Sequence, residues 1–479
     1  MLCLTIIAVF MSSLVSERGS RKGSGDEYSK LCREDLEALV EVVKEAECVH
    51  PSQEAKRRIF AERGILGTSK DRVLTAIYYK IMRRLGIIDK ALIRALNLPS
   101  IYILDPWLRA ALRVACFFLV FNDRDVDSEL FGVIRGGIAK FLSERTHPYV
   151  GVWYWDVVDK ILREYKYVPL SEVEELELKY LVPAWFIEKL KTMLEPSEVE
   201  EFLKAINKVP KICVRVNTLR ATVEEVEKHL KRHGKVVERS RYVSTVLKFK
   251  GPFKFEKCVL YKEGKIVNQD EACALASIIL DPKPGETVVD MCAAPGGKTS
   301  HMAELMKNTG RIYAFDIDKM RIERMRRILR RLGITNVKII EKSCLEAPKI
   351  LGEEIADKVL LDPPCSSTGT LAKYPEVRWR LRPEKIIEIA DMQYKMLETA
   401  IRLCKPGGRI LYTTCSVLPE ECEEVVKKIL RRYENIVKLV PINGPFSEGF
   451  VKGTMRAWPH RHDTVGFFYA LFEKVRSIK

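Results

Sequence analysis

The run Thr287-Val-Val-Asp-Met-Cys-Ala-Ala-Pro-Gly-Gly-Lys-Thr-Ser300 decides the fold of the second half of this chain. Its first residues are apolar and β-branched, as in a buried strand, and the small residues that follow make a turn that opens a helix. Backbone N–H groups at the start of a helix have no partner within the helix, so they are free to hold a ligand. The run therefore predicts a ligand-binding strand, turn and helix.

Strands and amphipathic helices alternate from Pro284 onward, which is typical of a doubly wound, mostly parallel sheet. The predicted strands cover residues 287–289, 311–315, 337–340, 358–361 and 409–412. The helix predicted over residues 320–332 is rich in arginine but carries an apolar stripe at helical spacing, so we expect its arginines to face solvent.

Two common nucleotide-binding motifs differ from this turn. A phosphate-binding P-loop needs a glycine where Cys292 stands, and a dinucleotide fingerprint needs spaced glycines where only the adjacent Gly296 and Gly297 occur. Asp316, at the end of the second predicted strand, is placed to accept hydrogen bonds from two ribose hydroxyls. The turn and Asp316 together predict a crevice for a nucleoside cofactor, with ATP and NAD disfavoured.

Two cysteines follow predicted strands at the edge of the sheet where ligands bind in open α/β folds. Strand 358–361 runs into Asp362-Pro-Pro-Cys365, and strand 409–412 runs into Thr-Thr-Cys415. An aromatic residue after Asp-Pro-Pro would suggest methylation of an exocyclic amine, whereas a cysteine suits covalent chemistry. Other cysteines are expected to be inert buried hydrophobes. These are Cys48, Cys116, Cys273 and Cys404.

A thiolate of this kind can activate a pyrimidine. Carbon 5 of cytosine is a poor nucleophile until a thiolate adds to carbon 6 and pushes electron density onto carbon 5. The adduct needs a proton at ring nitrogen 3, which we expect Asp362 to supply. A base then removes the carbon 5 proton, the thiolate leaves, and a second cysteine can assist that release.

These motifs resemble those of the Sun-type (Fmu-type) RNA cytosine-5 methyltransferases, a family that includes the bacterial small-subunit rRNA methyltransferase B. The resemblance covers residues 183–474. The matching motifs are Pro183-Ala-Trp185, Arg215-Val-Asn-Thr-Leu-Arg220, Gln269-Asp-Glu271, residues 290–299, 316–321 and 362–369, Thr414-Cys-Ser416, Pro459-His-Arg-His462 and Gly466-Phe-Phe468. It implies a Rossmann-like class I methyltransferase domain that uses S-adenosyl-L-methionine.

The resemblance also implies roles for individual residues. Cys415 would be the nucleophile and Cys365 would promote product release, whereas DNA cytosine-5 methyltransferases attack from the Pro-Cys position. The implied cofactor contacts are Cys292, Ala293, Ala294, Pro295, Gly296, Gly297, Lys298, Asp316, Arg321, Ser343 and Asp362. Ser343 stands where the family commonly has an acidic residue that meets the adenine end, so it is expected to substitute there.

Four segments are expected along the chain. Residues 1–25 form a leader, either disordered or started upstream of a true start at Met11. A secretion signal is the less favoured alternative, because the apolar run from Leu2 to Ser16 lacks a positive n-region, and the run is too short to span a bilayer. Residues 26–170 have helical spacing and resemble a NusB-like RNA-binding domain. Residues 175–265 resemble a small α+β, RRM-like module, and residues 266–479 form the methyltransferase domain.

The formal charge of +16 and the pI near 9.1 favour a polyanionic partner. A basic surface of the kind found in thermophilic proteins is the alternative. Thirteen cysteines without a C-x-x-C pair indicate a reducing cytoplasm and no zinc site. We expect a monomer that binds RNA, either rRNA or tRNA, and no membrane. A catalytically silent RNA-binding ribosome assembly factor and a DNA cytosine-5 methyltransferase remain as alternatives.

Overall fold

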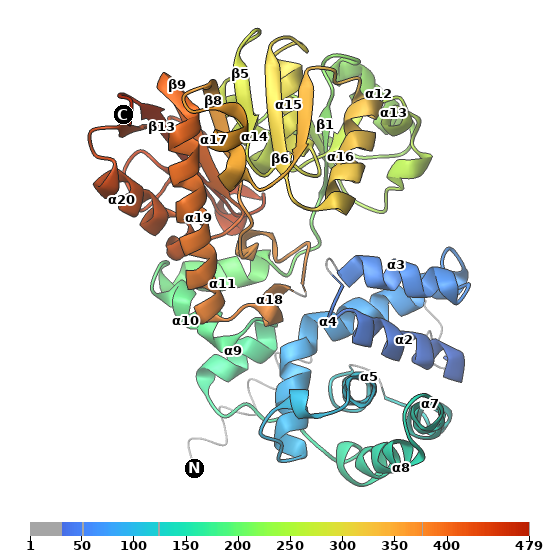
Figure 1. The fold of residues 1–479 in the computed structure, drawn as a ribbon. Coiled ribbons are helices and arrows are strands. Elements are labelled where there is room, and N and C mark those ends of the chain that lie inside the picture. Colours follow the sequence, from blue (N-terminus) through green and yellow to red (C-terminus); the bar gives the residue numbers. More distant parts are fainter. Residues whose placement is uncertain (1–30, 50–51, 123–124, 376, 479) are drawn as a thin grey trace. The chain divides into compact units, whose positions relative to one another are not determined.

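The computed structural model describes residues 31–49, 52–122, 125–375 and 377–478 (Figure 1). The leader expected over residues 1–25 lies outside these ranges. Contacts divide the chain into two units, Met1–Pro169 and Leu170–Lys479, and each is described by itself. In the described part of the chain, no helix is both long and apolar enough to cross a membrane.

The described part of the first unit is helical. Its elements are α2 (Arg33–Glu45), α3 (Ser52–Glu62), α4 (Ser69–Ala95), η1 (Ile101–Ile103), α5 (Pro106–Val120), α6 (Ser128–Gly132), η2 (Val133–Gly137), α7 (Ile138–Arg145), α8 (Pro148–Val157) and η3 (Val158–Leu162). Asp105 caps α5 by accepting the backbone N–H groups of Trp107 and Leu108 at 2.8 and 3.2 Å, as the Asp-Pro pair predicts.

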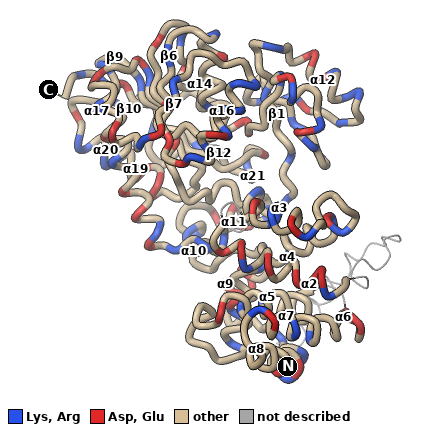
Figure 2. The backbone as a smooth tube through the Cα atoms, turned by 45° about the vertical axis from the view of Figure 1, so that its right-hand side comes forward, with Lys and Arg blue, Asp and Glu red and all other residues tan. Residues whose placement is uncertain are grey.

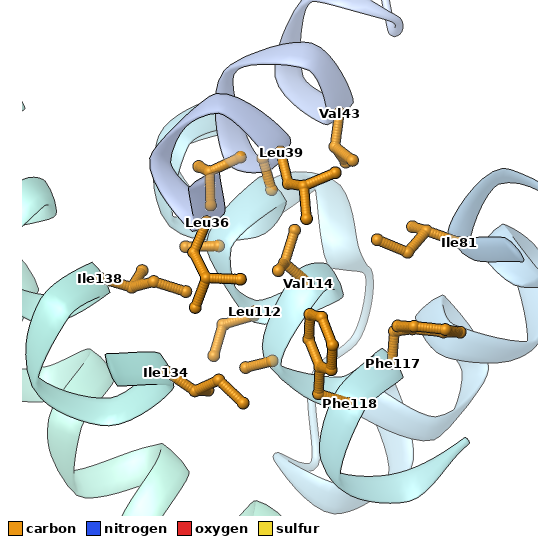
Figure 3. Close-up of a cluster of buried hydrophobic side chains, with 14 of the residues drawn as sticks. Leu36, Leu39, Val43, Ile81, Leu112, Val114, Phe117, Phe118, Ile134 and Ile138 are labelled. Atoms are coloured by element: carbon orange, nitrogen blue, oxygen red, sulfur yellow. The ribbon is translucent and has the colours of Figure 1, made fainter. Parts of the chain in front are cut away.

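Apolar side chains from α2, α4, α5, α7 and η2 converge on one core (Figure 3). The labelled members are Leu36, Leu39, Val43, Ile81, Leu112, Val114, Phe117, Phe118, Ile134 and Ile138, all at most 1% exposed. Cys116 is buried on α5, as expected. The prediction for Cys48 is wrong: it is exposed, because α2 ends at Glu45 and the chain turns away from the core just before this cysteine.

The second unit begins with α9 (Glu172–Tyr180), α10 (Ala184–Lys191) and α11 (Pro196–Ala205). A four-stranded antiparallel sheet follows, in the order β2-β3-β1-β4. Its strands are β1 (Ile212–Val216), β2 (Val237–Arg239), β3 (Val246–Phe249) and β4 (Ile266–Asn268), with α12 (Val223–Arg232), η4 (Phe255–Lys257) and α13 (Val259–Lys262) between them.

The large sheet has the order β11-β12-β13-β9-β8-β5-β6-β7, with β10 paired to β13. The strands are β5 (Thr287–Asp290), β6 (Arg311–Asp316), β7 (Val337–Glu341), β8 (Ala356–Leu361), β9 (Cys404–Thr414), β10 (Val437–Val440), β11 (Ser447–Glu448), β12 (Met455–Ala457) and β13 (Phe467–Lys474). Strands β5 to β9 pair in parallel, and β13 runs antiparallel to β9. The doubly wound, Rossmann-like prediction is confirmed.

Helices cover both faces of this sheet (Figure 1). One face packs against α14 (Glu271–Leu280), α15 (Gly297–Leu305) and α16 (Lys319–Leu332), and the other against α17 (Ala347–Leu351), α19 (Pro383–Leu403) and α20 (Glu423–Arg432). Neighbouring residues on a strand therefore enter different cores, as Val288 and Val289 do.

The arginines of α16 face solvent as expected, with one exception. Arg331 donates to the carbonyls of Tyr261 and Ile266, at 2.5 and 3.1 Å. Its guanidinium also lies 3.7 Å from the ring centre of Tyr261. The side chain is at the end of the helix, where it joins the large sheet's helix layer to the small module.

Candidate active site

The turn between β5 and α15 is shaped by its glycines and by Asp290. Gly296 has a φ of +99°, and a Cβ there would lie 2.9 Å from Cγ of Met325, so both backbone and space require glycine. Thr299 donates to Asp290 at 2.7 Å. Burial raises the pKa of Asp290 to about 7. The first N–H groups of α15 are thus held toward the carboxyl edge of the sheet.

The carboxylate of Asp316 fixes the same turn from the end of β6. It accepts the backbone N–H groups of Ala294 and Asp318, each at 3.0 Å. Arg321 donates to the carbonyl of Ala294, and its guanidinium lies 3.7 Å from Asp316. Arg321, expected as a cofactor contact, is therefore placed where it holds the cofactor turn and Asp316 together.

One buried polar atom beside this turn fits a bound ligand. The side-chain nitrogen Nε2 of Gln269 is buried and has no hydrogen-bond partner among the described residues. It lies 3.7 Å from where a Cβ of Gly297 would stand. The Gln269 oxygen accepts Arg215 at 2.6 Å, which sets the amide's orientation. A ligand with a carboxylate, such as the amino-acid end of S-adenosylmethionine, would satisfy this donor, so the residues present fit that cofactor.

The segment after β7 meets the same turn. Ser343 caps η5 (Cys344–Glu346) by accepting the N–H of Leu345 at 3.3 Å. The thiol of Cys292 donates to Cys344, which raises the pKa of Cys292 and lowers that of Cys344. The expected adenine-side residue Ser343 therefore lies next to a residue in contact with the cofactor turn.

The two cysteines identified from the sequence meet at the carboxyl ends of β8 and β9. These strands are parallel neighbours, with Leu361 opposite Tyr412. The segments that follow bring the sulfur atoms of Cys365 and Cys415 to 2.6 Å. Both residues are half-buried.

The hydrogen bond from Cys365 lowers the pKa of Cys415, although burial opposes this, and the same contact together with burial raises the pKa of Cys365 well above its ordinary value. Ser367 lies 3.5 Å from the Cys415 sulfur. Of the two thiols, Cys415 is therefore the one that more readily forms a thiolate, the form in which a cysteine attacks.

An ion pair links the cofactor turn to the thiols. Lys298 of α15 donates to Asp362 at 2.5 Å, and Thr413 donates to the other carboxylate oxygen at 3.2 Å. Burial opposes protonation of Lys298, but Asp362 raises its pKa above the usual range. The charge of Asp362 raises the pKa of Cys415, and the charge of Lys298 lowers it. Asp362 therefore links Lys298 of α15 to the end of β9, just before Cys415.

A buried network behind the thiols has no counterpart among the residues selected from the sequence. Glu421, which is fully buried, accepts the N–H of Ser366 at 2.8 Å and the hydroxyl of Ser416 at 2.7 Å. Gln393 donates to it at 3.2 Å. Burial raises the pKa of Glu421. Because Ser366 and Ser416 follow the two cysteines directly, this carboxyl group sets the spacing of the two thiol-bearing segments.

A metal site is not part of this arrangement. Within the residues that the structure describes, no group of three or more His, Cys, Asp or Glu side chains is suited to hold a metal ion. The geometry supports a nucleoside cofactor held by the β5 turn and Asp316, with a thiol nucleophile at the adjacent strand ends.

Comparison with known proteins identifies the family. Residues 277–473 match the model described as 16S rRNA methyltransferase RsmB/F, and residues 182–256 match the ferredoxin-like domain of RsmF/B-like methyltransferases. The probable ribosomal RNA small subunit methyltransferase B of Synechocystis is 31% identical over 66% of this chain and 74% of that protein.

Two further comparisons agree. The human 28S rRNA (cytosine(4447)-C(5))-methyltransferase is 34% identical over 63% of this chain and 39% of its own length. The crystal structure of PH0851 is 51% identical, covers 93% of this chain and 99% of its own, and superposes with a TM-score of 0.84. The turn, the paired cysteines and these similarities lead to one conclusion: the chain belongs to the RsmB/F family of 16S rRNA methyltransferases.

Proposed function

We propose that this protein methylates carbon 5 of a cytosine in ribosomal RNA, with Cys415 as the covalent nucleophile. The observation that carries the proposal is the contact of Cys415 with Cys365 at 2.6 Å, beside the Lys298–Asp362 pair. The small- and large-subunit rRNA substrates named for the relatives favour rRNA over tRNA.

The cofactor S-adenosyl-L-methionine, bound by this site, supplies the methyl group that carbon 5 receives. The backbone N–H groups at the start of α15 and the side chain of Gln269 would hold its amino-acid end. Asp316 would accept the ribose hydroxyls, and Ser343 would meet the adenine end. The small residues of the turn, Cys292 to Gly297, leave room for the cofactor to lie against the backbone.

Cys415 begins the reaction on the cytosine. Its thiolate adds to carbon 6, so a carbon–sulfur bond forms and the electron pair of the carbon 5–carbon 6 double bond becomes available at carbon 5. Lys298 donates to Asp362, and a proton passes from the Lys298 ammonium through this carboxyl group to ring nitrogen 3. The charge that the addition places on the ring is thereby neutralised.

Product release breaks the bond that Cys415 formed with carbon 6. Once carbon 5 carries the methyl group, a base takes the carbon 5 proton and ring nitrogen 3 returns its proton to the Lys298–Asp362 pair. The double bond re-forms, and the carbon 6–sulfur bond breaks with its electron pair returning to Cys415. Cys365 lies against the departing sulfur and donates to it, which stabilises the leaving thiolate. Cys365 therefore acts in product release.

The state of the cysteines bears on the compartment in which the enzyme works. The two thiols are free although they touch, and all cysteines among the described residues are free. Chemistry that depends on a thiolate requires a reducing compartment, so we propose that the protein works in the cytoplasm, as a monomer.

Transfer of labelled methyl from S-adenosylmethionine to rRNA, tRNA and duplex DNA tests the function, with bisulfite sequencing of the products. We expect label at one rRNA cytosine, with transfer lost in Cys415→Ala. Activity on duplex DNA that survives Cys415→Ala and disappears with Cys365→Ala would indicate a DNA methyltransferase instead. Cofactor binding without transfer to any RNA would favour a ribosome assembly factor.

A further inference from the structure

A groove of about 810 Å³ lies on the second unit. One wall comes from the end of α11 and the segment leading to β1, and another from the end of β3. Gly369, within η6 (Thr368–Thr370), also lines it, as do α21 (Pro459–His462) and the segment that follows α21. These segments are far apart in sequence, so the groove is a product of the fold.

The groove has an excess of positive charge. Six lysines line it against three carboxylates. The lysines are Lys204, Lys208, Lys211, Lys248, Lys250 and Lys373, and the carboxylates belong to Glu201, Asp270 and Asp463. Over the chain as a whole, blue and red segments are interspersed (Figure 2), so a twofold excess of lysines over carboxylates is a local feature.

The lysines divide into two groups by their partners. Lys211 and Lys248 are held in ion pairs with Asp463, at 2.9 and 3.7 Å, Lys373 pairs with Asp270, and Lys204 pairs with Glu200 at 3.3 Å. Lys208 and Lys250 are exposed, and among the described residues no carboxylate lies within ion-pair distance of either ammonium group. These two ammonium groups are therefore available to an external anion.

One residue that lines the groove contacts the backbone of Cys415. The N–H of Gly369 donates to the carbonyl of Cys415 at 2.9 Å. Gly369 is also tightly placed, because a Cβ there would lie 2.1 Å from the carbonyl oxygen of Gly466. A strand lying in the groove would thus run past the Lys373–Asp270 pair toward Cys415.

We propose that this groove holds the phosphate backbone of an unpaired RNA segment next to the target cytosine, with Lys208 and Lys250 as phosphate contacts. This inference rests on the proposed function. A base must leave a duplex before a half-buried thiol can attack its carbon 6, so the flanking strand is single where it enters the site. Lysine supplies a compact charge suited to phosphate without base preference.

The test compares full-length wild type, Lys208→Gln/Lys250→Gln and a matched control, Lys349→Gln/Lys395→Gln. The control removes the same charge from exposed lysines on α17 and α19, outside the groove. Binding of fluorescein-labelled oligocytidine is measured from roughly 50 to 200 mM salt. Each lost phosphate contact lowers the salt slope by about 0.7, so the groove variant should lose about 1.4, or roughly 25-fold in affinity at 0.1 M salt.

Methylation separates this inference from the function it rests on. In the groove variant, we expect KM for rRNA to rise in step with the binding loss while kcat and S-adenosylmethionine affinity match wild type. A groove variant whose salt slope and KM equal those of the control overturns the inference, even when wild type methylates rRNA. If wild type does not methylate rRNA, the proposed function is wrong instead. The binding comparison then still tests whether the groove holds RNA.

Discussion

The reactivity of Cys415 depends on one neighbour, and removing that neighbour gives a quantitative prediction. Cys365 donates to the Cys415 sulfur at 2.6 Å and lowers its pKa. A hydrogen bond to a charged group contributes about 1.5–3 kcal/mol. Losing it in Cys365→Ala therefore makes the thiolate about ten- to a hundredfold rarer at neutral pH, since a tenfold change corresponds to about 1.4 kcal/mol.

The same contact determines how the reactivity of Cys415 changes with pH. The thiolate is the reactive form and its fraction grows as pH rises, so a lowered pKa lets Cys415 react at lower pH than an ordinary thiol. Cys365→Ala should move the whole profile to higher pH. Cys365→Ser keeps a donor at the same place and should lie between the two.

Alkylation by iodoacetamide measures this without any substrate. The rate of modification of the Cys415 peptide is followed by mass spectrometry as a function of pH in wild type, Cys365→Ala and Cys365→Ser. Coincident profiles for wild type and Cys365→Ala would refute the reasoning, because the contact would then contribute nothing to the acidity of Cys415.

Three further variants test the site. Asp316→Ala should weaken S-adenosylmethionine binding about tenfold or more, by loss of charged hydrogen bonds to the ribose, and unchanged calorimetric affinity would refute that role. Gly369→Ala places a Cβ 2.1 Å from the Gly466 oxygen, so methylation should fall sharply, whereas wild-type kcat would show that this approach is not needed. Glu421→Ala leaves three hydrogen-bond donors without their acceptor and should lower the free energy of unfolding by about 3 kcal/mol or more. A loss below about 1 kcal/mol in urea titration would contradict the role of this network.

Much of the fold follows from sequence because the strands end in motifs. The small-residue turn after Val289 and the Asp-Pro-Pro and Thr-Cys segments mark where three neighbouring strands stop. Parallel strands in a doubly wound sheet end at one edge, so these motifs had to meet. The predicted 409–412 strand is nevertheless longer in the structure, starting at Cys404, because the Pro406-Gly407-Gly408 segment continues the pairing with β8 through a register shift.

Other features of the site depend on distances between residues far apart in the chain, and the spacing of apolar residues in the sequence does not give those distances. The contact between Cys365 and Cys415 needs the register that sets Leu361 opposite Tyr412. Glu421 follows Pro419-Glu420 and looks like a solvent-facing acid, yet it is fully buried because two serines and Gln393 surround it. No sequence signal distinguishes it from the half-buried Glu420 or the exposed Glu424.

The corrections have the same origin. Cys48 is exposed because helix α2 ends three residues earlier, and helix ends are the least certain part of a periodic pattern. Arg331 is half-buried because α13 and β4 present carbonyl oxygens to it, and these come from a separate stretch of sequence.

The central claim is that Cys415 bonds to carbon 6 of an RNA cytosine. Ribosomal RNA transcribed with 5-fluorocytosine tests it most directly, because the fluorine at carbon 5 cannot be removed as a proton and the adduct persists. After incubation with S-adenosylmethionine, digestion and mass spectrometry locate the attached nucleotide. The account predicts it on Cys415 in wild type and in Cys365→Ala, and no adduct in Cys415→Ala. An adduct on Cys365, or one that survives in Cys415→Ala, would contradict it.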